Sequence, residues 1–117
     1  MKKLILALSF LLSASSVCAD YKTTFDRLET LANQGNLHAQ INLATAYRKG
    51  TGVTQDYKKA VKWFTLAAEQ GDASAQYNLG VMHSFGLGII PDYKPAVKWF
   101  TLAAEQGNAL AQYNLGR

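Results

Sequence analysis

Two nearly identical stretches decide the fold: residues 55–80, QDYKKAVKWFTLAAEQGDASAQYNLG, and residues 91–116, PDYKPAVKWFTLAAEQGNALAQYNLG. They lie 36 positions apart and differ only at the pairs Gln55/Pro91, Lys59/Pro95, Asp72/Asn108 and Ser74/Leu110. Residues 35–60 form a more diverged copy of the same pattern. A repeat of this length indicates an array of similar structural units, in which each unit packs on its neighbours.

The period sets the expected domain organisation from residue 20 onward. We expect a half unit over 20–34, complete units over 35–70 and 71–106, and a partial unit over 107–117. The whole chain of 117 residues is long enough for one small domain. The units are therefore expected to form one continuous array.

Each unit is expected to contain two helices. In the second half, Tyr57, Val61, Phe64 and Ala68 recur at the spacing of one helix face. The first half is expected to be helical from about residue 37 to residue 48, and no segment alternates apolar and polar residues as a strand does. The sequence thus predicts an all-α solenoid of antiparallel helical hairpins with a period of 36 residues.

The ends of the second helix carry recognisable capping residues. Asp56 and Asp92 stand where an N-cap side chain accepts hydrogen bonds from the first turn. Gly71 and Gly107 stand where a left-handed residue ends a helix. These aspartates recur once per unit, so we interpret them as helix caps and not as a catalytic pair.

Four large aromatic residues are expected to fill the core between helices: Trp63, Phe64, Trp99 and Phe100. Their neighbours include many alanines, which let helix backbones approach closely, and the rings would fill the remaining space. An exposed stacking platform is the alternative for the tryptophans. Their position in the middle of an alanine-rich helix favours packing.

The first 19 residues have the pattern of a signal peptide. Lys2 and Lys3 precede an apolar run over 4–12, and small residues follow over 13–19, so cleavage is expected before Asp20. The apolar run is too short to span a bilayer, and we expect no stable membrane insertion after cleavage. A buried core helix and a lipoprotein anchored through Cys18 are the alternatives. We therefore predict an exported protein, periplasmic or secreted.

Composition excludes several classes of protein. Hydrophobic residues make up 49% of the chain and charged residues 17%, which fits a folded domain and not a disordered tail. Two of the charges behind the net +4 belong to Lys2 and Lys3, and no run of Lys and Arg follows. We expect no nucleic-acid binding. Cys18 is the only cysteine, so the mature chain would have no disulfide.

The repeated strings resemble the Sel-one-like repeat family. The resemblance rests on residues 73–80 (ASAQYNLG), 86–88 (GLG), 92–99 (DYKPAVKW) and 103–107 (AAEQG), and it covers residues 20–117. It implies a right-handed superhelix, related to tetratricopeptide repeats, that serves as a protein-binding adaptor or scaffold. Exported bacterial members are linked to envelope assembly, motility and host contact. Ala44 in place of a glycine and His83 in place of a tyrosine are mild departures.

No residue pattern indicates an enzyme. His38 and His83 occupy non-equivalent positions in their units. His83 stands at a packing position, and no carboxylate lies near it at metal-ligand spacing. No combination of serine, histidine and aspartate suggests a catalytic triad. We expect no catalytic residue, no metal and no cofactor. A cell-wall or β-lactam-directed hydrolase and a non-functional fragment of a longer repeat scaffold are the alternatives. A cysteine-rich subset of the family is reported to bind or hydrolyse β-lactams, and the expected cysteine-free mature chain argues against membership of it.

Candidate partner-binding residues come from the first helices, where the units differ or carry recurring polar groups. Asparagine recurs with the period and offers a donor and an acceptor to a peptide backbone on the concave face; bonding to a neighbouring unit is its alternative role. The second unit presents an apolar patch, and the first unit a basic rim. The candidates are Asn42, Asn78, Asn114, Tyr77, Val81, Met82, Phe85, Arg48 and Lys49. Drift after duplication would also produce the differences.

The last helix has an apolar outer face. Leu110, Tyr113 and Leu115 lie where terminal repeats usually carry polar residues. We expect the chain to self-associate through residues 108–117. The partner itself is expected to be a protein or peptide.

Overall fold

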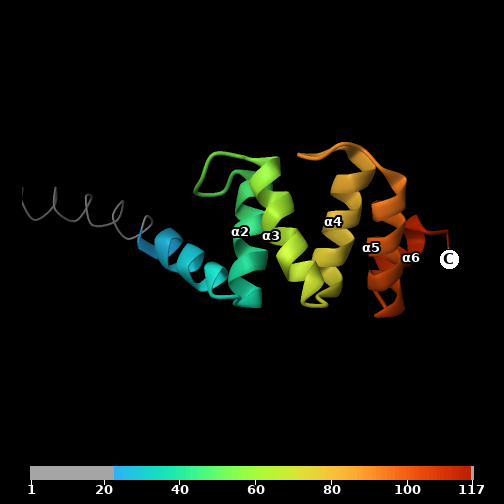
Figure 1. Ribbon diagram of the computed structural model, residues 1–117, viewed down its shortest axis with the longest axis horizontal. Helices are drawn as coiled ribbons and strands as arrows, with labels where there is room; N and C mark the ends of the chain where they lie inside the picture. The colour runs from blue at the N-terminus through green and yellow to red at the C-terminus, as the bar shows by residue number, and fades with distance from the viewer. Residues whose placement is uncertain (1–22, 117) are drawn as a thin grey trace, which may run out of the picture.

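The computed structural model describes residues 23–116, and all regular structure in that range is helical (Figure 1). The first helix covers residues 23–33. Five more follow: α2 (Leu37–Lys49), α3 (Tyr57–Glu69), α4 (Ala73–Phe85), α5 (Tyr93–Glu105) and α6 (Ala109–Asn114). The predicted all-α class is confirmed. The predicted signal peptide lies outside the described residues, and within them no helix is long and apolar enough to cross a bilayer.

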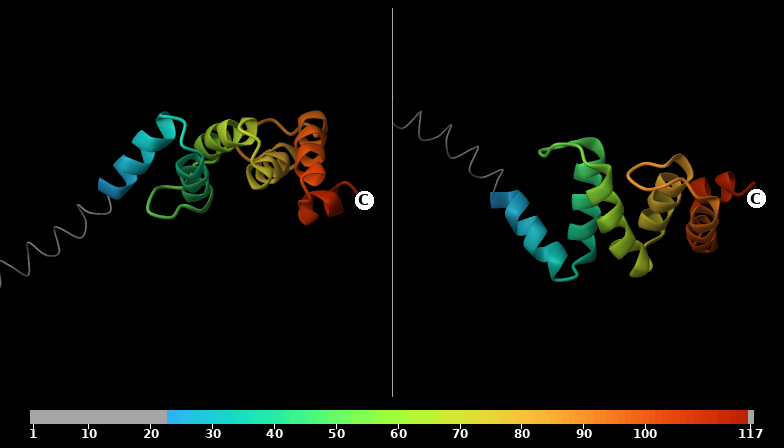
Figure 2. Two further views of the ribbon diagram at one scale, coloured as in Figure 1. Left: turned by 90° about the horizontal axis from the view of Figure 1, so that it is seen from below. Right: turned by 45° about the horizontal axis from the view of Figure 1, so that its top comes forward.

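The helices form two layers. Each packs on the next along the chain, α2 on α3, α3 on α4, α4 on α5 and α5 on α6. The left view of Figure 2 shows α2, α4 and α6 on the lower side, and helix 23–33, α3 and α5 on the upper side. We call the first set the A-type helices and the second set the B-type helices. The expected solenoid of helical hairpins is therefore present.

Each connection from a B-type to an A-type helix is held by two linked capping motifs. After α3, Gly71 has φ +98° and its N–H donates to Ala68 O at 2.9 Å. The next residue, Asp72, accepts a hydrogen bond from Ala75 N at 2.8 Å and begins α4. The predicted left-handed glycine is confirmed at Gly71 and at Gly107. The N-caps Asn36, Asp72 and Asn108 were not among the predicted caps.

The connections from an A-type to a B-type helix end with the predicted aspartate caps. Asp56 accepts from Lys59 N at 3.1 Å, and Asp92 accepts from Lys94 N at 3.0 Å. Both satisfy amides that the first helical turn leaves without a partner. The caps explain why the B-type helices start at the same point of each unit.

The core is built mainly of alanine, with aromatic rings inserted between the helices. Trp63, Phe64 and Phe100 are buried, as predicted. Gly80 makes room for Phe100, since a Cβ at Gly80 would lie 2.8 Å from that ring. Trp99 corrects the prediction, because it is only half-buried. It packs against the core cluster that includes Leu79 and Met82 of α4, and part of its ring stays in contact with solvent.

Paired glutamines connect successive units. Gln70 donates through Nε2 to Gln40 Oε1 at 2.8 Å and to Gly35 O at 3.0 Å. Gln40 is buried and donates to Ala32 O at 3.1 Å. The second unit repeats the arrangement, with Gln106 bonded to Gln76 at 2.9 Å. Both glutamines recur every 36 residues. This recurrence is the sequence signal that could have predicted the network.

Candidate partner-binding surface

An open cavity of about 390 Å³ lies over α4, α5 and α6. We call it the apolar groove; its lining residues are Tyr77, Val81, Ser84, Phe85, Tyr93, Phe100 and Asn114. Phe85 is 73% exposed and Tyr93 is 76% exposed, an unusual state for two aromatic side chains beside one cavity. The groove thus has exposed aromatic walls and polar groups from Ser84 and Asn114.

The groove brings together four of the predicted partner-binding residues: Tyr77, Val81, Phe85 and Asn114. The Tyr77 ring lies 5.8 Å from the Phe100 ring, centroid to centroid, and tilted to it by 47°. Sequence reasoning missed Tyr93, because it recurs as Tyr57 and therefore resembled a core position. The loop after α4 distinguishes the two, because it lies on Tyr57 and has no counterpart at Tyr93 within the described residues.

Met82 does not belong to this surface, and its assignment as a partner-binding residue was wrong. Its side chain is 1% exposed and packs in the core with Ala75 and Leu79. These three residues are spaced four and three apart, so they share one helix face. Phe85 follows Met82 by three residues but is the last residue of α4, beyond that part of the core, and it is 73% exposed.

A second open cavity, of about 360 Å³, lies at the end of α2. Its lining residues are Asn42, Thr45, Ala46, Lys49 and Thr51. Lys49 is exposed and gives the cavity a positive charge. Arg48, the other predicted basic residue, is half-buried and lies outside this lining; its carbonyl oxygen accepts a 2.7 Å hydrogen bond from Gln55. Of the two predicted basic residues, only Lys49 lines the cavity.

The three asparagines do not share one site. Asn42 lines the α2 cavity and Asn114 lines the apolar groove. Asn78 donates to Ser74 O of its own helix at 2.9 Å. This bond stays within α4, so it is not the alternative bond to a neighbouring unit; the role of Asn78 toward a partner stays a prediction.

The two histidines lie apart in the array. His38 is exposed on α2, whereas His83 on α4 is partly buried and its Nδ1 has no hydrogen-bond partner among the described residues. Loss of solvation lowers the pKa of His83, and the nearby charge of Asp92 opposes the effect. Across residues 23–116 no cluster of three histidine, cysteine, aspartate or glutamate side chains is placed to hold a metal.

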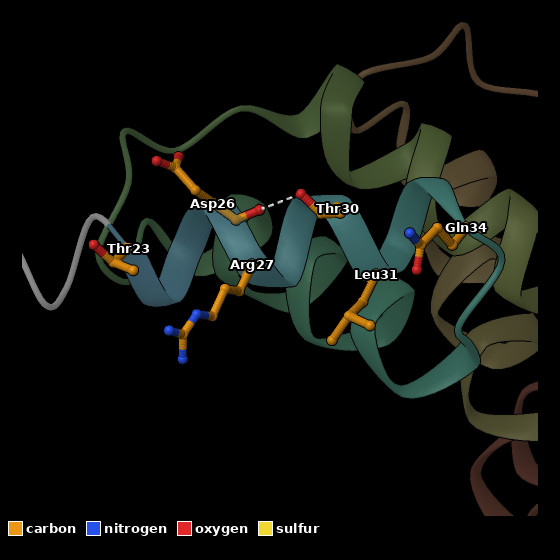
Figure 3. A pocket seen from close by; sticks show the side chains of 6 residues that line it. All are labelled: Thr23, Asp26, Arg27, Thr30, Leu31 and Gln34. Carbon is orange, nitrogen blue, oxygen red and sulfur yellow. Dashed lines mark hydrogen bonds between the residues drawn. The ribbon is translucent and has the colours of Figure 1, made fainter.

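A third cavity, of about 510 Å³, opens on the outer face of helix 23–33 (Figure 3). It is lined by Thr23, Asp26, Arg27, Thr30, Leu31 and Gln34. Thr30 Oγ1 donates to Asp26 O at 2.9 Å, so this threonine is bonded within the helix. The described lining comes from helix 23–33 and from Gln34 directly after it.

The family model for the Sel1 repeat matches residues 37–72, 73–108 and 109–117. The chain belongs to the Sel1 repeat family. These boundaries lie two residues after the expected unit starts at 35, 71 and 107, and they have the same period. Sel1 repeat proteins are generally protein-interaction scaffolds.

Solved structures support the same family. A protective antigen present in uropathogenic Escherichia coli strains, which displays an SLR fold, is 45% identical with a TM-score of 0.75; the match covers 78% of this chain and 20% of that one. A Sel1 repeat protein from Oxalobacter formigenes is 40% identical with a TM-score of 0.74, covering 76% and 26%. Helicobacter pylori cysteine rich protein B is 26% identical with a TM-score of 0.71, covering 77% and 68%.

The matches thus span about a fifth and a quarter of the first two of these proteins. No curated protein sequence matched the chain.

Proposed function

We propose that this Sel1 repeat protein is an exported interaction module whose A-type helices bind an extended segment of a protein partner. The apolar groove carries the proposal. Its two most exposed aromatic residues, Phe85 and Tyr93, face a cavity large enough for a bulky side chain. Exposed apolar patches beside a concave surface are characteristic of interaction sites, and aromatic residues dominate their binding energy.

The groove and the α2 cavity suggest which segment would bind. A large apolar side chain of the partner would enter between Phe85 and Tyr93. Asn114 has a donor and an acceptor that suit a peptide backbone. Lys49, at the other cavity, would attract an acidic side chain. We therefore expect the partner segment to combine a bulky apolar residue with an acidic one.

Export is proposed on the residues before Asp20. The lysine pair, the apolar run over 4–12 and the small residues over 13–19 support it. N-terminal sequencing of the protein recovered outside the cytoplasm should find Asp20 first. A chain that starts at Met1 or carries a lipid on Cys18 would contradict the proposed soluble export. The proposal assigns no catalytic role.

A displayed peptide library, selected on the purified protein, tests the groove. Peptides that the parent enriches should bind the Phe85→Ser variant about thirtyfold more weakly, since loss of a central interface aromatic costs about 2 kcal/mol. Ile90→Ser is the matched control, because Ile90 is 84% exposed and lies outside the groove lining. Equal affinities of the parent and Phe85→Ser for the selected peptides would contradict the proposed site.

A further inference from the structure

The α2 cavity and the apolar groove are lined at equivalent positions of their helices. Thr45 and Lys49 of α2 line the α2 cavity, and Val81 and Phe85 of α4 line the apolar groove. The two pairs lie 36 positions apart, which is the period of the array. Residues four apart lie on one face of a helix, so α2 and α4 offer the same face to a partner. We call this face, with its two residues on each helix, the contact face.

The local structure at the end of the contact face is the same in both units. Lys49 is the last residue of α2, and Phe85 is the last residue of α4. A left-handed glycine follows each of them, Gly50 with φ +73° and Gly86 with φ +68°. The N–H of each glycine donates to the carbonyl oxygen four residues earlier. The two side chains therefore leave helix ends of the same geometry.

Both side chains are open to solvent inside the array. Lys49 is exposed although the following unit lies beside it, and Phe85 is 73% exposed although the preceding unit lies beside it. A neighbour on either side thus leaves this position open. Its exposure is a property of the repeat.

The chemistry of the contact face changes from one unit to the next. In α2 the face carries the hydroxyl of Thr45 and the ammonium of Lys49, whereas in α4 it carries the apolar side chains of Val81 and Phe85. A lysine attracts a carboxylate and repels another cation. An exposed aromatic ring gains most from a large apolar side chain. The same position of the repeat therefore favours an acidic residue in one unit and a bulky apolar residue in the next.

The arrangement of the helices sets the distance between these two contacts. Both α2 and α4 pack on α3, and the loops that follow α2 and α4 lie at the same edge of the molecule, at the top of Figure 1. Packed helices have axes about 8–10 Å apart, so α2 and α4, with α3 in the other layer, lie roughly 10–17 Å apart. An extended segment advances about 3.3 Å per residue and spans this distance with about three to five residues.

We propose that the contact face binds an extended partner segment in a fixed register, with an acidic residue at Lys49 and a bulky apolar residue at Phe85, about three to five residues apart. This inference rests on the proposed function and adds the spacing to it. It also assigns the choice of residue type to the last residue of each of the two helices. Exchange of that residue should change which side chain is selected and should leave the spacing unchanged.

A displayed library of designed peptides tests this inference on the protein recovered from cells that express all 117 residues. Each peptide places two residues, chosen from Asp, Phe and Ala, at separations of one residue up to about eight in a chain of glycine and serine. The parent should enrich peptides that hold one Asp and one Phe about three to five residues apart. At other separations the acidic contact is lost, and binding should be about threefold weaker.

Two substitutions should change the selection in opposite ways. Lys49→Phe should enrich peptides with two Phe residues at the same spacing, because both units then offer an aromatic ring. Phe85→Lys should enrich peptides with two Asp residues at that spacing. Both side chains are exposed at a helix end, so neither change alters the core.

Matched controls separate the contact face from general surface effects. His38→Phe adds the same ring to α2 at an exposed residue outside both cavity linings. Ile90→Lys adds the same charge close to the end of α4, at a residue that is 84% exposed and outside the groove lining. Both variants should enrich the same peptides as the parent.

The outcomes separate this inference from the proposed function. Enrichment of peptides with one Asp and one Phe at every separation alike would overturn the fixed register and leave the proposed function in place. Selection of the same peptides by Lys49→Phe and the parent would show that this position does not choose the residue type. A parent that enriches no peptide would contradict the proposed function, and this inference with it.

Discussion

The complete units 35–70 and 71–106 have almost the same B-type helix in two different surroundings. Tyr57 is half-buried, whereas its equivalent Tyr93 is 76% exposed. Trp63 is 5% exposed, whereas Trp99 is half-buried. The sequence around these residues is nearly unchanged, so the neighbouring unit determines whether a residue belongs to the core or to the surface.

The loop after α4 supplies much of that difference. Gly88 has φ +73°, and a Cβ at this position would collide with the backbone of Tyr57 and Lys58. The loop therefore lies directly on the start of α3. Within the described residues no equivalent loop covers the start of α5. This is why the aromatic residue there remains available to line the apolar groove.

The largest expected effect compares the two tryptophans. Trp63→Ala should lower the free energy of unfolding by about 3–5 kcal/mol, because it leaves a large cavity in a packed core. Trp99→Ala should cost about half as much, since part of its ring is already in water. Urea unfolding followed by circular dichroism measures both. Equal losses would show that the two units have the same packing in solution.

A glycine pair tests the contact between the loop and the helix. Gly52→Ala and Gly88→Ala both place a side chain at positive φ, +74° and +73°, which costs about 1–2 kcal/mol. Only Gly88→Ala adds a clash with the backbone of Tyr57, because no described residue lies within 4 Å of a Cβ at Gly52. Thermal unfolding should rank Gly88→Ala as the less stable variant. The reverse order would contradict the close approach of the loop.

The smallest expected effect is a dependence of stability on pH that comes from His83 in the second unit. Burial lowers the pKa of His83 below 6.5, so protonation favours the unfolded chain. The stabilising contribution is complete above pH 6.5 and is lost as the pH falls through the lowered value. His83→Tyr copies Tyr47 of the first unit and should flatten this part of the stability profile. An unchanged profile between parent and variant would contradict the role of His83.

Local features of the fold could be predicted from the sequence, and features that depend on neighbours could not. The period, the helix pattern and the caps Asp56 and Asp92 depend on residues close together in the chain. The burial of Met82 and the half-exposure of Trp99 depend on which helices pack nearby. The apolar groove was anticipated at Tyr77, Val81 and Phe85. Tyr93 was missed because the sequence around it matches that around Tyr57. Only Tyr57 is covered by the loop after α4.

The paired glutamines have a consequence for how the units keep their alignment. Alanine contacts are much alike from one turn to the next, so by themselves they do little to fix how far one helix is shifted along another; the fit of Phe100 against Gly80 and the glutamine pairs do more. A slide of one turn would separate Gln70 from Gln40 by several ångströms and leave a buried amide without a partner, at a cost of about 1–3 kcal/mol. The same penalty applies at Gln106 and Gln76. Each polar pair thus sets the register of its hairpin, and the repeated register sets the pitch of the array.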